Sequence, residues 1–62
     1  MDVENLTDLL REAEEHHGVY EATAPEHHWS VFYAAYISAR EQGNPPRDAD
    51  AAARAYVESA TG

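Results

Sequence analysis

The sequence predicts an all-α fold, a compact three-helix domain with short loops. Apolar residues recur every three to four positions in three segments, which is the periodicity of one helix face. Glycine and proline clusters separate these segments, and no alternating β-branched run predicts a strand. The 62 residues are enough for one domain, spanning 1–62, with expected helices at about 4–17, 25–41 and 46–59.

The first expected helix covers residues 4–17 and has a leucine-rich face. Its members follow the 3, 4, 7 spacing and are Leu6, Leu9, Leu10, Ala13 and His17. Gly18 is a natural stop, because glycine takes the left-handed conformation at a helix end without a steric clash. The alternative is continuation to Tyr20, which falls on the same face.

The second expected helix, 25–41, has the strongest pattern. Thr23-Ala24-Pro25-Glu26 is typical of a helix start, with Pro25 or Glu26 in the first turn. Its aromatic-rich face spans an arc of about 140°. That face comprises Trp29, Phe32, Tyr33, Tyr36 and Ile37. Val31 is expected on the opposite side, and Glu41-Gln42-Gly43 should end the helix.

The third expected helix, 46–59, follows Asn44-Pro45-Pro46, a segment that a helix cannot cross. Its expected inner face is rich in small residues and comprises Ala49, Ala52, Ala53, Tyr56 and Ala60, with Val57 on the flank. Large side chains would then face small ones across the core. The expected core or interaction stripe of the whole chain is Leu6, Leu9, Leu10, Trp29, Phe32, Tyr33, Tyr36, Ile37 and Tyr56.

The charge of the chain limits its partners. Twelve acidic residues face four basic ones, giving a formal charge of −8, which argues against nucleic acid and anionic membranes as partners. No apolar run approaches the roughly 20 residues that a membrane span needs. The acidic start Met1-Asp2-Val3-Glu4 is unlike a signal peptide, so the expected location is the cytoplasm.

We find no catalytic or cofactor-binding motif, and the expectation is that the protein is not an enzyme. The chain has no cysteine, and its serines and threonines lie in no nucleophile elbow. Its three glycines form no phosphate-binding loop.

The four histidines are candidate metal ligands, and they form two adjacent pairs, His16-His17 and His27-His28. Neighbouring residues on a helix point about 100° apart, so neither pair chelates one ion easily. Glu14 and His17 make one Glu-x-x-His motif, whereas di-iron bundles use two, together with two further carboxylates. We therefore expect no metal, with Glu14 and His17 as the first candidates if one binds.

Position on the expected helices also predicts an environment for each imidazole. His17 should be in the core or at its boundary and His16 on a flank. His27 should be solvated, and His28 should lie half-buried beside the aromatic face.

Two segments, Leu9–Pro25 (LLREAEEHHGVYEATAP) and Glu26–Ile37 (EHHWSVFYAAYI), resemble a small helical domain common in actinobacteria. That domain occurs alone or appended to glyoxalase/bleomycin-resistance proteins of the vicinal-oxygen-chelate superfamily. The resemblance extends from Leu9 to Gly43. Two departures are Phe32 in place of tryptophan and Asn44-Pro45-Pro46-Arg47-Asp48 in place of a Thr-Pro-Glu-Glu start. The paired βαββ modules and metal ligands of the chelate enzymes are absent from this sequence, so the resemblance implies an accessory domain without their activity.

Two functional hypotheses follow. The first is a non-enzymatic interaction or accessory module that self-associates as a homodimer or docks on a partner protein. The alternative is a small metal- or ligand-binding protein that uses the region of His16, His17, His27 and His28.

Overall fold

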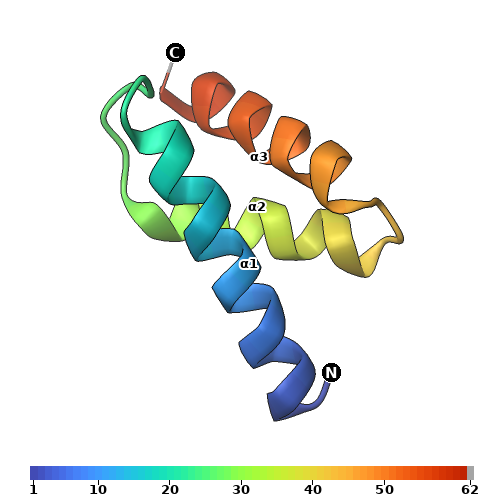
Figure 1. Cartoon of the computed structure of the whole chain (residues 1–62). Helices are drawn as coiled ribbons and strands as arrows, with labels where there is room; N and C mark the ends of the chain where they lie inside the picture. Colours follow the sequence, from blue (N-terminus) through green and yellow to red (C-terminus); the bar gives the residue numbers. More distant parts are fainter. Residues whose placement is uncertain (62) are drawn as a thin grey trace.

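The computed structural model describes residues 1–61 and has three helices within that range, α1 (Val3–Glu21), α2 (Trp29–Glu41) and α3 (Pro46–Thr61). It has no strand in the described residues, and the predicted all-α three-helix fold is confirmed. Figure 1 shows α2 as the middle element, with α1 crossing it on one side and α3 running beside it. α1 and α3 have much less contact with each other than either has with α2.

The first helix is a turn longer than the main expectation. The carboxylate of Asp2 accepts a hydrogen bond from the Asn5 amide at 2.7 Å and caps the start of α1. Gly18 was the expected stop, but it has ordinary helical geometry, and α1 continues to Glu21. The continuation places Tyr20 in the core, where its ring lies 5.6 Å from that of Phe32.

The expected start of the second helix is wrong. Residues 22–28 form a connection, and α2 begins four residues later than expected, at Trp29. Thr23 donates to the Tyr20 carbonyl at 3.4 Å, at the end of α1, and so does not cap α2. The cap is His28, whose Nδ1 accepts a hydrogen bond from the Ser30 amide at 3.2 Å.

The connection between α2 and α3 is tight because Gly43 adopts a φ of +98°. The Gly43 amide donates to Arg40 O, and the Asn44 amide donates to Ala39 O. Together these two bonds make the Schellman ending that favours glycine at this position. Pro46 then opens α3 in the first helical position, where proline needs no amide partner.

The core combines large aromatics of α2 with small residues of the other helices. Phe32 and Tyr36 are fully buried against Ala13 of α1 and against Ala49 and Ala53 of α3. Because alanine allows close helix approach, α2 and α3 make the most extensive contact in the molecule. Large residues thus face small ones, which is how a small core fills its volume without voids.

Several expected core positions lie at the surface instead. Leu6 and Leu10 are 41 % and 39 % exposed, Trp29 is 52 % exposed, and Tyr56 is 58 % exposed. Leu9, Tyr33 and Ile37 are half-buried, leaving Phe32 and Tyr36 as the fully buried members of the stripe. The leucines are exposed because the N-terminal half of α1 extends beyond the other two helices (Figure 1).

Two valines also differ from their expected positions. Val57, expected on the flank of the third helix, is fully buried and takes the core place assigned to Tyr56. Val31, expected to point away from the core, is half-buried and packs against it.

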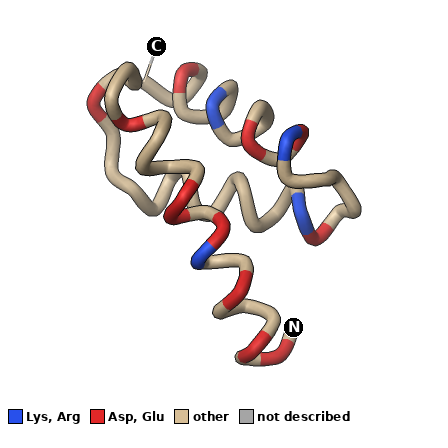
Figure 2. The backbone as a smooth tube through the Cα atoms, in the orientation of Figure 1, with Lys and Arg blue, Asp and Glu red and all other residues tan. Residues whose placement is uncertain are grey.

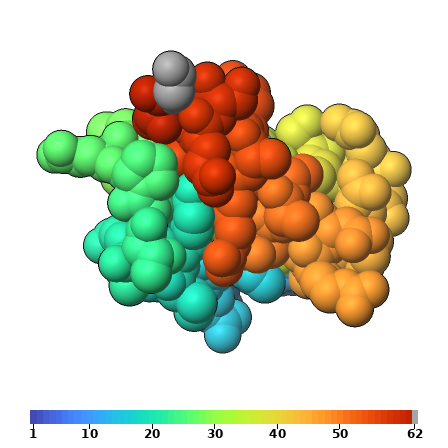
Figure 3. Space-filling model, turned by 90° about the horizontal axis from the view of Figure 1, so that it is seen from above, coloured from blue at the N-terminus to red at the C-terminus, as the bar shows by residue number. Residues whose placement is uncertain are grey.

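The molecule is elongated, with extents of 33 × 18 × 16 Å, because α1 protrudes. Figure 2 shows acidic residues all along α1, whereas α2 carries charge only at its C-terminal end. Viewed from above in Figure 3, α3 lies between the end of α1 on one side and the end of α2 on the other. None of the described helices is long and apolar enough to span a bilayer.

Candidate functional site

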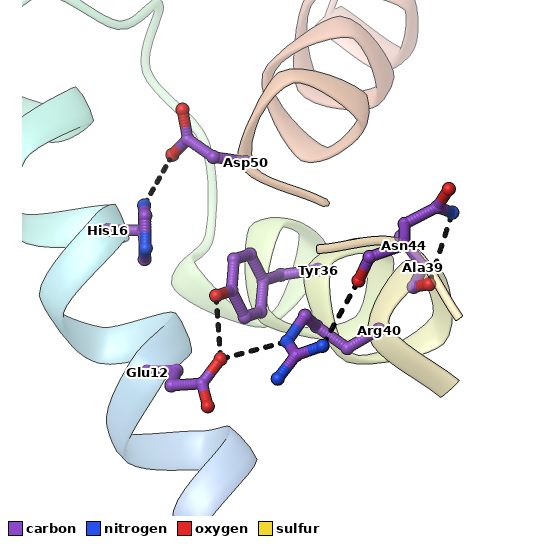
Figure 4. A network of polar contacts seen from close by, with 7 residues as sticks. All are labelled: Glu12, His16, Tyr36, Ala39, Arg40, Asn44 and Asp50. Carbon is purple, nitrogen blue, oxygen red and sulfur yellow. Dashed lines mark hydrogen bonds and ion pairs between the residues drawn. The ribbon is translucent and has the colours of Figure 1, made fainter. Parts of the chain in front are cut away.

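One polar network centres on Glu12 and joins α1 to α2 (Figure 4). A single carboxylate oxygen of Glu12 accepts hydrogen bonds from the Tyr36 hydroxyl at 2.9 Å and from Arg40 Nε at 3.0 Å. Arg40 also donates through Nη1 to the Asn44 carbonyl at 3.1 Å, and the Asn44 side chain donates to Ala39 O. The network therefore satisfies a buried phenol and at the same time holds the loop that follows α2.

The network shifts the pKa values of its members. The hydrogen bond from Arg40 lowers the pKa of Glu12 below its ordinary value, although partial burial opposes the shift. Burial, with the Glu12 hydrogen bond second, raises the pKa of Tyr36 to about 12. Both groups therefore keep one protonation state at neutral pH, which suits a structural link and gives neither a proton to exchange near pH 7.

A second polar network joins α1 to α3. His16 Nδ1 lies 3.0 Å from Asp50 Oδ1. Arg54 Nε lies 2.8 Å from the other oxygen of Asp50, as an ion pair whose angle falls outside hydrogen-bond geometry. The Arg54 guanidinium also lies 4.9 Å from the centre of the Tyr20 ring, a cation–π contact. These contacts tie α3 to α1, which it otherwise touches little.

A third polar contact joins His17 of α1 to His27 of the loop before α2. Their Nε2 atoms are 3.1 Å apart, and their rings meet nearly at right angles. His17 Nδ1 lies 3.5 Å from Glu21 Oε2, and His27 Nδ1 lies 2.7 Å from the Pro25 carbonyl oxygen. The pair opens onto a surface hollow of about 380 Å³.

The histidine contact corrects an expectation of the sequence. The sequence predicted no two histidines at ligand spacing, whereas the fold brings the Nε2 atoms of His17 and His27, ten residues apart in the chain, to 3.1 Å. His27, expected to be solvated, is half-buried, and His28, expected to be half-buried, is exposed as a helix cap. The loop sets this contact, so a helical spacing rule carried through residues 25–28 could not find it.

The expected metal candidates divide between buried and exposed positions. His17 is buried, as expected, but its polar contacts are with His27 and Glu21. Glu14, the other first candidate, is exposed and lies near enough to Tyr33 that its charge helps raise the pKa of that phenol, behind burial. Among residues 1–61, no three histidine, cysteine or acidic side chains gather as a ready-made metal site.

An apolar groove of about 560 Å³ is formed by α2, α3 and the connection between them. Most of its lining residues are small, and none of those described carries a charge. They are Val31, Ala34, Ala35, Ser38, Ala39, Gln42, Asn44, Ala52, Tyr56 and Ala60. We refer to this surface as the α2–α3 groove. Sequence periodicity missed it because Ala52, Tyr56 and Ala60 were assigned to the core.

Comparison with protein-family models, curated proteins and solved structures finds no match for this chain.

Proposed function

We propose that the protein is a non-catalytic interaction module that self-associates through the α2–α3 groove. The observation that supports this most strongly is the absence of charge from the groove lining in a chain whose formal charge is −8. Depletion of charged residues marks the centre of protein interfaces. An uncharged face is also where two copies of an acidic protein repel each other least.

The groove favours a second copy as its occupant, since one face carries both a projection and a recess. Tyr56 is 58 % exposed at the groove, and Val31 stands on the opposite wall. Small residues of α2, including Ala34, Ala35 and Ser38, also line the groove. In a two-fold dimer each copy presents the same face, so Tyr56 of one copy meets the alanine recess of the other.

Burial of the exposed Tyr56 ring would stabilise such a dimer. An aromatic ring buries substantial area at an interface and loses little conformational freedom, which is why such residues dominate binding energy. In an isolated chain, Tyr56 instead leaves an apolar ring beside an apolar groove in water. The resemblance to appended helical domains supports the alternative accessory role, in which the chain docks on a partner protein.

The experiment is light scattering after size exclusion, on the full chain from about 10 µM to 1 mM. We expect a concentration-dependent shift from 6.9 kDa toward twice that mass. The variant Ala52→Glu places a carboxylate on the groove wall and should weaken the dimer more than tenfold, because a charge buried without a partner is costly. Ala51→Glu adds the same charge at the neighbouring exposed position outside the groove lining and should leave the dimer intact.

A monomer at every concentration would contradict self-association. Equal weakening by both variants would show that total charge, rather than the groove, governs the result. Circular dichroism of both variants checks that helix content is unchanged.

A further inference from the structure

The contact between His17 and His27 has the spacing of two ligands on one metal ion. A tetrahedral zinc ion has Zn–N bonds of about 2.0–2.1 Å, which place two ligand nitrogens about 3.3–3.4 Å apart. The two Nε2 atoms are 3.1 Å apart, with their rings inclined at 82°. Small movements of the two rings would therefore make room for an ion between them.

The outer nitrogens of both rings face groups that only accept hydrogen bonds. His27 Nδ1 is 2.7 Å from the Pro25 carbonyl oxygen, so this nitrogen carries the proton and leaves a lone pair on Nε2. His17 Nδ1 is 3.5 Å from a Glu21 carboxylate oxygen, which is too long for a strong hydrogen bond, so His17 can carry its proton on Nε2 and donate it to His27. A metal ion bound between the rings would take the place of this proton, and the proton of His17 would then lie on Nδ1, beside Glu21.

The same pattern is typical of histidine ligands in metal sites. There the free ring nitrogen donates to a carboxylate or a backbone carbonyl, which orients the ring and makes the ligating nitrogen more basic. Here Glu21 and the Pro25 carbonyl occupy these two positions.

The surroundings provide access and negative charge. The pair borders a hollow of about 380 Å³ lined by His17, Glu21, Ala24, Pro25, Glu26 and His27. The carboxylates of Glu21 and Glu26 are exposed, so water can enter the hollow and either carboxylate can approach an ion there.

We propose that His17 and His27 bind one divalent ion of the zinc type through their Nε2 atoms, with water or a nearby carboxylate completing its coordination. Imidazole ligands suit zinc, copper and nickel rather than magnesium or calcium. The proposed site shares no residue with the α2–α3 groove, so it stands independently of the self-association proposal.

The rival explanation is a single proton shared by the two rings. Such a pair is held by an N–H···N hydrogen bond between His17 and His27 that Zn²⁺ does not displace. The two explanations differ in what zinc does to the ring nitrogens.

The test is a Zn²⁺ titration of the untagged full chain at pH 7.5, followed by calorimetry and by ¹⁵N chemical shifts of the histidine rings. We expect one Zn²⁺ per chain, with large shifts at Nε2 of His17 and His27 and none at His16. His27→Gln, in the loop, should weaken binding more than tenfold. His28→Asn removes the adjacent imidazole while keeping a capping side chain, and should change the affinity less than twofold.

Three results would overturn the proposal. The first is no saturable Zn²⁺ binding up to about 1 mM. The second is equal loss of affinity in His27→Gln and His28→Asn. The third is ring nitrogens that respond to pH but not to Zn²⁺, which identifies a shared proton only. The ring shifts are measured on the unmodified chain, so they decide the matter even if a variant folds poorly.

Discussion

Tyr36 and Trp29 lie seven residues apart on the same expected face of α2, yet their surroundings are opposite. Tyr36 is fully buried and its hydroxyl donates to Glu12, whereas Trp29 is the first residue of its helix and is half exposed. The Trp29 ring packs edge-on against Tyr33, at 4.9 Å, and beside His28. Size and hydrophobicity alone therefore do not predict which of the two side chains is buried.

We expect Tyr36→Ala to unfold the domain and Trp29→Ala to be mild. Truncating a fully buried aromatic costs about 3–5 kcal/mol, and a chain of this length has little more in reserve. Trp29→Ala removes mostly contacts at the surface, and such substitutions typically lower the free energy of unfolding by about 1 kcal/mol or less. Thermal melts followed by circular dichroism compare the two. A Tyr36→Ala melt within a few degrees of the unmodified chain would contradict the core assignment.

Alkaline pH should destabilise the fold through Tyr36. Its pKa rises from the ordinary 10.0 to about 12 in the folded chain, because burial and the Glu12 hydrogen bond disfavour the phenolate. The resulting stabilisation is complete below pH 10.0 and is lost as pH rises toward about 12. Urea unfolding at pH 9 and 11 should therefore show a smaller loss in Tyr36→Phe than in the unmodified chain. Equal losses would mean that other groups carry the dependence.

The end of a helix depends on the residues that follow it and on their tertiary contacts. The sequence therefore predicts a helix boundary correctly only where the following residues are themselves helix breakers. The break at Gly43 was predictable, because a helix cannot continue through the Asn44-Pro45-Pro46 segment that follows it. No helix-breaking residue directly follows Gly18, and burial of Tyr20 favours continuation of α1. The predicted start of α2 was wrong because the Thr23 hydroxyl donates to the Tyr20 carbonyl at the end of α1 and does not cap α2. The local sequence does not reveal this contact.

The two glycines should respond oppositely to alanine. Gly18 is helical, with nothing within 4 Å of an added Cβ, so Gly18→Ala should stabilise the fold by about 0.5–1 kcal/mol. Gly43 has equal space but a φ of +98°, so Gly43→Ala should destabilise it by about 1 kcal/mol. Urea denaturation measures both. A destabilised Gly18→Ala would be incompatible with the observed length of α1.

For the whole molecule, periodicity predicted the fold class and the number of helices but not which residues remain exposed. Periodicity shows which side of a helix a residue lies on, but not whether another helix packs against that side. Leu6 and Leu10 were therefore expected in the core, although α1 extends past its neighbours and leaves them exposed. The choice between Tyr56 and Val57 depended on a rotation of α3 that Ala49 and Ala53 set by packing closely on α2. Both the α2–α3 groove and the contact between His17 and His27 arise from such tertiary detail.

An isotope-filtered nuclear Overhauser experiment tests whether the chain self-associates through the α2–α3 groove. Equal amounts of ¹³C-labelled and unlabelled chain would be mixed at a concentration where light scattering shows the dimer. We expect contacts between chains from the Tyr56 ring to the methyl groups of Ala34 and Ala35. Contacts between chains that involve only Leu6 and Leu10 of α1, or no such contacts at all, would contradict it.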